Sequence, residues 1–330
     1  MHYAIRIEQP GGPDVLRSHP VTLAPPGPLE LQLTQRAVGL DFIDVYHRSG
    51  LYPLPSMPHG IGLEAAGVVT AVGSEVDPQQ FSVGERVVYL SRPPGAYASA
   101  RNVPAEHCVT LPSTISDEVA AASLLKGLTA EYLVHRVRPL DAGSRALVHA
   151  AAGGTGSLLC QWLAWHGVEV IGTVGSEAKV DVALAHGCTK VLVDADDDAA
   201  GLAAAVRAAG SGGGVQVAYD SIGRRTFSAS LACLERRGLL VSFGNASGPP
   251  PPLDVLSLST QGSLFVTRPT LFDYVATRAE LLAATTRLFA AIRDGILRVP
   301  VHQRWPLRDA AEAHRALEAR ETTGASVLIP

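Results

Sequence analysis

The feature that most constrains the fold is a glycine-rich turn at residues 149–156, with the sequence HAAAGGTG. An apolar run at 146–150 leads into it, as in a buried parallel strand, and a helix is predicted at 157–166. Glycines at such a point let the backbone approach an anion, which the first amides of the helix attract. Ala151 stands where the first glycine is usual, and a residue this small still permits the turn. The turn predicts a site for the pyrophosphate of a dinucleotide, built from Ala152, Gly153, Gly154, Thr155 and Gly156. A turn that serves packing alone is the alternative.

Short apolar runs continue to alternate with helical segments after this turn. A helix at 177–186 ends at Gly187, a residue type favoured just past a helix end. Four further strands are predicted at 168–173, 190–193, 215–220 and 239–243. Strand and helix in repeated succession predict an α/β domain with a doubly wound parallel sheet of the Rossmann type. We assign residues 124–300 to this domain.

The first 120 residues differ from this pattern in composition. They are rich in Gly and Pro and contain short β-prone runs at 29–33, 66–72 and 86–90. They predict a mostly β domain at residues 1–123. The last 30 residues are too few to form a domain alone, although a helix is expected at 309–319 and a strand at 325–329. We therefore expect residues 301–330 to complete the first domain.

The composition limits the classes of function. Hydrophobic residues make up 47% of the 330 positions and charged residues 18%, which is typical of a well-buried globular protein. The formal net charge of −4 argues against nucleic acid as a main partner. The four cysteines show no Cys-x-x-Cys spacing and indicate reduced thiols, and we find neither a secretory leader nor an apolar run of roughly 20 residues. These features predict a cytoplasmic protein that does not enter the membrane.

The end of the second strand of the α/β domain indicates which dinucleotide is bound. An acidic residue about 20 positions after the glycines would bind the ribose 2′-hydroxyl of NAD, but Gly175 occupies that place. Ser176 and Lys179 follow on the first turn of the next helix, where a hydroxyl and an ammonium suit a 2′-phosphate. The sequence therefore predicts NADPH rather than NADH. Glu177 is the dissenting residue, because a small register error would bring its carboxylate to the ribose.

Further segments resemble those of a known family over the whole chain. A resemblance to the medium-chain dehydrogenase/reductase superfamily is carried by GLDFID at 39–44, GLEAAGVV at 62–69 and GERVV at 84–88. Within it, the zinc-free, zeta-crystallin-like NADPH:quinone oxidoreductases are the members that the chain resembles most specifically. That resemblance is carried by RSGLYP at 48–53, LKGLT at 125–129, the turn at 149–156, VSFGN at 241–245 and VTRP at 266–269. It implies a GroES-like substrate domain in addition to the Rossmann domain.

The resemblance also implies that no zinc ion is bound. Zinc-dependent members hold the catalytic metal with Cys, His and Cys, and the matching positions here are Asp41, Leu63 and Lys126. An aliphatic side chain cannot coordinate a metal, and an ammonium repels one. Hydride transfer without a Lewis acid suits an acceptor that is already electron-poor, such as a quinone or an activated enone.

Individual residues receive roles by the same resemblance. Tyr46 and Tyr52 match substrate-pocket tyrosines that would orient or protonate the quinone oxygen. Asp41 stands where relatives usually carry Asn and is expected near the nicotinamide, with the alternative that it only caps a helix. Asp194 replaces a tyrosine beside the adenosine phosphate, which removes one contact. Other residues expected around the cofactor are Lys126 and Thr129 at the nicotinamide, Ser221, Phe243, Asn245 and Val266 along the cleft, and Arg320 from the C-terminal segment.

The function predicted from the sequence is reduction of a small quinone by hydride from C4 of the nicotinamide of NADPH. The resemblance implies a homodimer joined through an edge strand at 262–267. Two alternatives stay open. An enone or alkenal double-bond reductase would use the same cofactor with another acceptor, and an NADPH-binding structural or stress protein would show little turnover.

Overall fold

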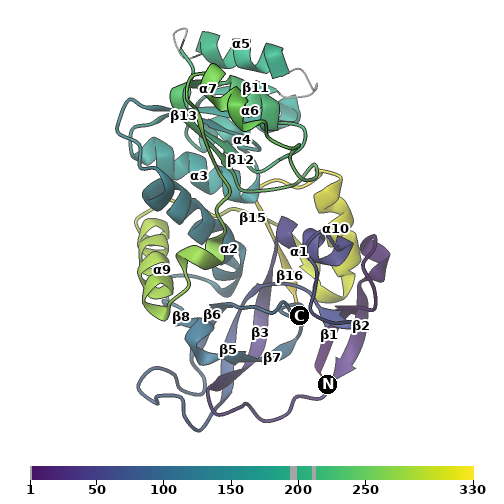
Figure 1. Ribbon diagram of the computed structural model, residues 1–330. Coiled ribbons are helices and arrows are strands. Elements are labelled where there is room, and N and C mark those ends of the chain that lie inside the picture. Colours follow the sequence, from purple (N-terminus) through teal and green to yellow (C-terminus); the bar gives the residue numbers. More distant parts are fainter. Residues whose placement is uncertain (1, 194–198, 210–212) are drawn as a thin grey trace. The chain divides into compact units, whose positions relative to one another are not determined.

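The computed structural model describes residues 2–193, 199–209 and 213–330 (Figure 1). The chain forms two compact units, the first made of Met1–Leu128 with Val275–Pro330 and the second of Thr129–Tyr274. The sequence placed the boundaries near 123 and 300, so the second unit is shorter at both ends than expected. Helix α9 (Arg278–Arg293) belongs to the first unit, where Arg278 donates hydrogen bonds to the carbonyl oxygens of Ala105, Glu106 and Cys108. No local pattern reveals such a contact between distant segments.

The second unit is built on a six-stranded sheet in which every pair of neighbouring strands is parallel. The strands in spatial order are β11 (Cys188–Val193), β10 (Glu169–Val174), β9 (Arg145–Val148), β12 (Val215–Asp220), β13 (Leu234–Ser242) and β14 (Phe265–Thr267). The chain enters at the centre of the sheet, winds outward to one edge and then returns to build the other half. This is the order of a doubly wound Rossmann sheet, so the predicted fold class is confirmed.

Helices cover both faces of this sheet. On one face Ile171 packs with Val206 of α5 and Phe227 of α6. On the other face the sulfur of Cys160 on α3 lies 3.5 Å from that of Cys188 on β11. The helices of this unit are α3 (Gly154–Trp165), α4 (Val180–Ala185), α5 (Ala199–Ala209), α6 (Phe227–Ala232), α7 (Val255–Thr260) and α8 (Leu271–Tyr274). The end of α2 (Asp117–Tyr132) and a π-helical turn, Leu133–Val137, precede them.

The first unit contains two mainly antiparallel sheets. The smaller sheet consists of β2 (Arg17–Val21), β1 (His2–Ile7) and β4 (His59–Gly60). The larger one runs in the order β15 (Val301–Pro306), β16 (Ala325–Ile329), β3 (Glu30–Leu40), β5 (Glu64–Val72), β6 (Arg86–Leu90) and β8 (Cys108–Thr110), with β7 (Ala100–Pro104) paired to β3. Strand β16 pairs antiparallel with β3, so the last strand lies in the larger sheet of the first unit.

Two helices connect these sheets to the site described below. Helix α1 (Phe42–Ser49) starts directly after β3, and α10 (Ala310–Glu318) lies between β15 and β16 in the sequence. The core beneath them contains Leu33, Tyr97 and Leu328, each with no more than 1% of its surface exposed. Within the described residues, no helix is both long and apolar enough to span a bilayer.

Candidate active site

The glycine-rich turn forms the tight strand-to-helix corner that the sequence predicts. The N–H of Ala151 donates to the carbonyl oxygen of Thr173, and that of Gly153 to the carbonyl oxygen of Ala150. A Cβ atom on Gly156 would lie 2.2 Å from the oxygen of Ala150, so only glycine fits there. The residue of this corner with a left-handed backbone is Ala150, whose φ is +53°. Ala151, at the position where the first glycine is usual, is fully buried. The corner therefore presents the first amides of α3, which fit a pyrophosphate.

A buried polar network supports this corner and was missed in the sequence analysis. The Nδ1 atom of His149 lies 3.0 Å from Oγ1 of Thr173, and its Nε2 atom lies 2.9 Å from Oγ of Ser230. The Ser230 hydroxyl donates to Oδ2 of Asp220 at 2.8 Å. His149, Thr173 and Asp220 stand at the carboxyl ends of neighbouring parallel strands, where open α/β sheets bind ligands. That placement is the signal that could have found them.

Asp220 also shapes the loop after β12. Its Oδ1 atom accepts hydrogen bonds from the N–H groups of Ile222 and Gly223, at 2.8 and 3.0 Å. Its carbonyl oxygen accepts the N–H of Phe243. A Cβ on Gly244 would lie 2.2 Å from the oxygen of Ser221, so the loops after β12 and β13 touch through their backbones. The structure thus brings together three residues expected along the cleft, Ser221, Phe243 and Asn245, while the fourth, Val266, lies on β14 and pairs with Leu240.

The segment after β10 carries the residues expected at the 2′-phosphate. Gly175 and Ser176 are exposed, and Lys179 is half-buried. The N–H of Lys179 donates to the carbonyl oxygen of Ser176 across a 3₁₀ turn, Glu177–Lys179, that leads into α4. The backbone therefore holds Ser176 and Lys179 at the two ends of one turn. Asp194 lies outside the described residues.

In the first unit, a buried cluster of charged side chains surrounds Lys126. Its Nζ atom lies 2.6 Å from Oδ1 of Asp41 and 3.7 Å from Oε1 of Glu64, and it donates to the carbonyl oxygen of Leu40 at 3.1 Å. None of the three charged side chains has more than 7% of its surface exposed. The sequence analysis did not single out Glu64, although a carboxylate in an otherwise apolar strand was a visible signal.

Burial and mutual charge shift the pKa values in this cluster. Burial raises the pKa of Glu64 well above its usual value, and the neighbouring Asp41 raises it further. Burial alone would lower the pKa of Lys126, but Asp41 and Glu64 outweigh it and the pKa rises. Burial, and then the charge of Asp41, raise the pKa of Asp44 to about 8. The cluster thus keeps its cation charged while favouring neutral forms of Glu64 and Asp44.

Asp41 occupies the N-cap position of α1 as well as facing Lys126. Its backbone N–H donates to Oδ2 of Asp44 at 2.9 Å, the carboxylate-to-N-cap half of a capping box. Asp41 thus stands at the helix start that the sequence offered as the alternative, and it also pairs with Lys126. The same Oδ2 atom of Asp44 accepts the hydroxyl of Tyr97 at 3.0 Å.

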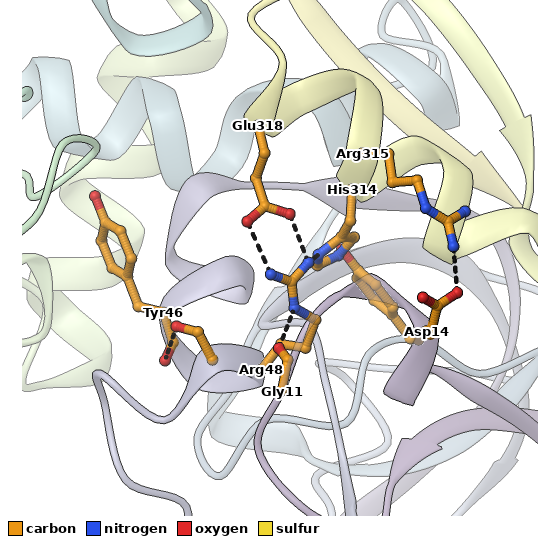
Figure 2. A network of polar contacts seen from close by, with 9 residues as sticks. Gly11, Asp14, Tyr46, Arg48, His314, Arg315 and Glu318 are labelled. Atoms are coloured by element: carbon orange, nitrogen blue, oxygen red, sulfur yellow. Dashed lines mark hydrogen bonds and ion pairs between the residues drawn. The ribbon is translucent and has the colours of Figure 1, made fainter.

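A hydrogen-bonded chain continues from Tyr97 toward the surface. Its hydroxyl lies 3.0 Å from Nε2 of His314, whose Nδ1 atom lies 3.2 Å from Nη1 of Arg48. Figure 2 shows Arg48 between His314 and Glu318, to which its guanidinium donates two hydrogen bonds of 2.7 and 2.8 Å. Because arginine can only donate, Nδ1 of His314 accepts, and its Nε2–H group donates to Tyr97. Burial and the nearby Arg48 lower the pKa of His314 to about 3, so its ring is neutral.

The two tyrosines expected in the substrate pocket are in contact with each other. The rings of Tyr46 and Tyr52 meet edge to face, with centroids 5.1 Å apart, and the N–H of Tyr52 donates to the carbonyl oxygen of Tyr46. In Figure 2 the ring of Tyr46 points away from Arg48 and Glu318. Thr129 follows Lys126 by three positions on α2 and is 9% exposed. Arg320 lies just past α10, exposed and in a left-handed conformation with φ of +60°.

The three positions that carry zinc ligands in metal-dependent dehydrogenases do not form a metal site. Leu63 is 1% exposed and offers no donor atom. Asp41 is the only one of the three residues with an oxygen atom that could bind a metal. The Lys126 ammonium already pairs with that carboxylate and takes the place that a metal ion would need. This donor set does not fit Zn²⁺.

Comparisons with known proteins agree with this geometry. Residues 27–140 match the family described as alcohol dehydrogenase GroES-like domain, and residues 154–284 match zinc-binding dehydrogenase. The chain is 46% identical over 331 residues to quinone oxidoreductase 1 of Escherichia coli strain K12, with coverage of 99% of this chain and 100% of that protein. It is 41% identical over 336 residues to 2-haloacrylate reductase of a Burkholderia species, with coverage of 100% and 99%.

A solved structure shows the same fold. The crystal structure of Escherichia coli quinone oxidoreductase complexed with NADPH has a TM-score of 0.95 and 45% identity, and the match covers 99% of this chain and 100% of that one. The resemblance found in the sequence is thereby confirmed over the full length. The chain belongs to the quinone oxidoreductase family of the medium-chain dehydrogenase/reductase superfamily.

Proposed function

We propose that the protein reduces a small quinone with NADPH. The observation that carries this proposal is the corner at residues 149–156, where glycine is the only residue type that fits at position 156. The chain that forms this corner matches an NADPH-bound quinone oxidoreductase over its full length. Bound NADPH supplies two electrons as hydride from C4 of its nicotinamide ring. The donor set at Asp41, Leu63 and Lys126 adds no metal, which suits an electron-poor acceptor.

The residues of the second unit would bind the cofactor in three groups. The turn, with Ala152 through Gly156, and the start of α3 would hold the pyrophosphate. The exposed segment from Gly175 to Lys179 would hold the 2′-phosphate, because Ser176 offers a hydroxyl and Lys179 a cation. The backbone-linked loops that carry Ser221, Phe243 and Asn245 would line the cleft together with Thr129 and Val266.

The residues of the first unit would act on the acceptor. As a quinone takes up hydride its oxygen becomes anionic, so a donor or a cation near that oxygen lowers the barrier. Tyr46 and Tyr52 supply phenolic hydroxyls and a flat aromatic surface, and Lys126 supplies a buried positive charge. We propose that these three residues contact the quinone, that Asp41 acts on it through Lys126, and that Arg320 contacts the cofactor.

A second candidate acceptor has support of its own. The chain is nearly as similar to a 2-haloacrylate reductase as to the quinone oxidoreductases. A haloacrylate is an activated double bond, and hydride addition to it also creates an anion that needs the same cation and donors. An enone-type or haloacrylate acceptor is therefore the alternative substrate class.

The decisive experiment follows NADPH and NADH oxidation at 340 nm, a standard reporter of reduced nicotinamide, with a panel of quinones, enones and 2-haloacrylates. We expect the highest kcat/KM for NADPH with a small quinone. A higher kcat/KM with a haloacrylate than with any quinone would show that the protein reduces activated double bonds instead. Tight NADPH binding without oxidation by any acceptor would favour the structural or stress-protein role.

The same assay tests the preference for NADPH over NADH. A ratio of kcat/KM with NADPH to kcat/KM with NADH near one would contradict the roles of Ser176 and Lys179. The Lys179→Gln variant tests the role of Lys179 directly.

We also propose a cytoplasmic homodimer. Strand β14 forms one edge of the six-stranded sheet, and Phe265 on it is 57% exposed, so a second copy that pairs along this edge would cover both the backbone groups and the ring. The four free thiols suit a reducing compartment. Sedimentation equilibrium of wild type and Phe265→Glu tests the dimer, because the charge should produce a monomer.

A further inference from the structure

We propose that Glu64 is held as a neutral acid which shares its proton with Asp41, and that this pair restores the proton that Lys126 gives to the reduced quinone. The inference deepens the proposed function and rests on it, since it names the source of the proton that must accompany the hydride. It assigns Asp41 and Glu64 the role of positioning residues that act through Lys126.

The count of charges in the cluster carries the first step. Two carboxyl groups, Asp41 and Glu64, face one ammonium, and all three are buried. If both carboxyls were ionised, the cluster would bury an uncompensated negative charge, which is strongly unfavourable. The ammonium lies 2.6 Å from Asp41 but 3.7 Å from Glu64, so Asp41 takes the ion pair. Glu64 is therefore the group that holds a proton.

The unsatisfied oxygen atoms show where that proton lies. In the described residues, Oδ2 of Asp41 and Oε1 of Glu64 are buried without a hydrogen-bond donor. The other oxygen of Glu64 already accepts the N–H of Leu125 at 2.6 Å. A hydrogen bond with the side chain of Asp41 is one of the causes that raise the pKa of Glu64, after burial and the charge of Asp41. A single proton held between Oδ2 of Asp41 and Oε1 of Glu64 would satisfy both oxygens.

Glu64 is fully buried, and it is tightly packed on the side of Gly39. A Cβ atom on Gly39 would lie 2.3 Å from Oε1 of Glu64 and 2.4 Å from the carbonyl oxygen of Ala121, so there is no room for even a methyl group on that side. Among the residues that the structure describes, Asp44 and Tyr97 are further titratable groups that interact with the cluster. Both have raised pKa values, so neither adds a negative charge at neutral pH. Asp41 and Lys126 are therefore the charged groups that lie next to the proton on Glu64.

The chemical step balances as follows. Hydride brings two electrons and one hydrogen to the quinone, which becomes the hydroquinone monoanion. An O–H bond forms at the anionic oxygen as an N–H bond breaks at Nζ of Lys126, which gives neutral hydroquinone. The Glu64–Asp41 pair then returns a proton to Nζ, and solvent later reprotonates Glu64. NADPH is the reductant, the quinone is the oxidant, and one proton is consumed in each turnover.

The first test needs no cofactor. Infrared spectroscopy of the cofactor-free protein at pH 7 should show the carbonyl band of a buried carboxylic acid, and this band should disappear in Glu64→Gln. It should also disappear in Asp41→Asn, because Lys126 then pairs with Glu64 and ionises it. Asp44 has an acid band of its own, which depends on the charge of Asp41. Wild type and both variants are therefore compared in an Asp44→Asn background, where the difference spectra isolate Glu64. Identical spectra for wild type and both variants would overturn the inference.

The second test measures turnover. Glutamine at position 64 can accept from Leu125 and donate to Asp41, but it has no proton to release. We expect kcat of Glu64→Gln to fall by about a hundredfold, at the lower end of what general acid catalysis contributes. The affinity for NADPH should stay unchanged. Wild-type kcat should decline as pH rises and Glu64 ionises, with a solvent deuterium isotope effect, and the variant should lose this pH dependence. Glu75→Gln, at an exposed position, is the matched control.

The two proposals fail in distinguishable ways. If wild type reduces no quinone, the proposed function is overturned, and proton delivery to a quinone falls with it. If wild type reduces quinones while Glu64→Gln keeps its kcat, pH profile and isotope effect, only the role of the Glu64–Asp41 pair is overturned. Should Glu64→Gln not fold, the infrared spectrum and pH profile of Asp41→Asn decide in its place.

Discussion

Arg48 on α1 and Glu318 at the end of α10 form a two-pronged ion pair that ties together segments 270 positions apart. Arg48 is 2% exposed and also donates to the carbonyl oxygen of Gly11. Replacing it with Met leaves Glu318 and His314 without their donor, so we expect the free energy of unfolding to fall by about 2–3 kcal/mol, the scale of a hydrogen bond to a charged group. Urea denaturation measures this loss.

Arg315 provides the control, because it pairs on the surface with Asp14, as Figure 2 shows, and also with Glu312. Exposed ion pairs of this kind contribute little to stability. Arg315→Met should therefore unfold at the same urea concentration as wild type. Equal losses of unfolding free energy in the two variants would show that the buried Arg48–Glu318 pair stabilises the fold no more than an exposed ion pair does.

Asp44 should make stability depend on pH. Its pKa is about 8 in the folded protein, against the ordinary value of 3.8. Between these values the folded state holds a proton that the unfolded chain has released, so the contribution of Asp44 is complete below about pH 4 and is lost as pH rises toward about 8. Asp44→Asn binds no proton here and keeps an acceptor for Tyr97. Urea denaturation between pH 6.5 and 9 should show wild type losing stability relative to this variant, with a plateau above about pH 8. Parallel curves would contradict the pKa of Asp44.

Gly156→Ala should weaken cofactor binding. The added Cβ would lie 2.2 Å from the carbonyl oxygen of Ala150, so the corner must open to admit it. We expect the Kd for NADPH, measured by fluorescence titration, to rise by at least about tenfold, equivalent to about 1.4 kcal/mol. Gly12→Ala is the control, because nothing lies within 4 Å of its added Cβ. Binding equal to wild type in Gly156→Ala would remove the corner from the cofactor site.

Asp220→Ala should damage both stability and cofactor binding. The carboxylate accepts from two backbone N–H groups and from the hydroxyls of Thr226 and Ser230. Its removal leaves several buried donors without an acceptor, at about 1–3 kcal/mol each. We expect a lower melting temperature and a higher Kd for NADPH, while Asp254→Ala, which removes an exposed cap on α7, should leave the Kd unchanged. A wild-type Kd in Asp220→Ala would show that the loop holds its shape without this residue.

Local patterns were sufficient to predict the Rossmann unit. Its strands are short, apolar and parallel, and each is followed by a helix, so the order of elements alone specifies the doubly wound sheet. The corner at Gly156 was predictable for the same reason, since strand, turn and helix are contiguous in the sequence. Even the closing strand at Ala325–Ile329 could be placed, because so short a segment must pack on an existing domain.

The charged cluster could not be predicted in this way. Lys126 meets Asp41 across 85 positions, and His149 meets Ser230 across 81, so only the folded chain brings these partners together. The sequence analysis treated Asp41 as a single unusual residue, and its meaning depends on the ammonium it faces. Glu64 is visible in the sequence as a carboxylate in an apolar strand, but its role depends on Lys126, which only the fold brings to it.

The pairing of β16 with β3 has a consequence for biosynthesis. Thr129–Tyr274 form an uninterrupted stretch of chain, so this unit can acquire its structure as soon as it leaves the ribosome. Strand β3 precedes the second unit in the chain, whereas its neighbour β16 follows that unit. Until β16 is made, the part of β3 at Val38, Gly39 and Leu40 lacks the strand that pairs with it and stays open to pairing with other nascent chains. The first unit can thus be completed only after the whole second unit has been made.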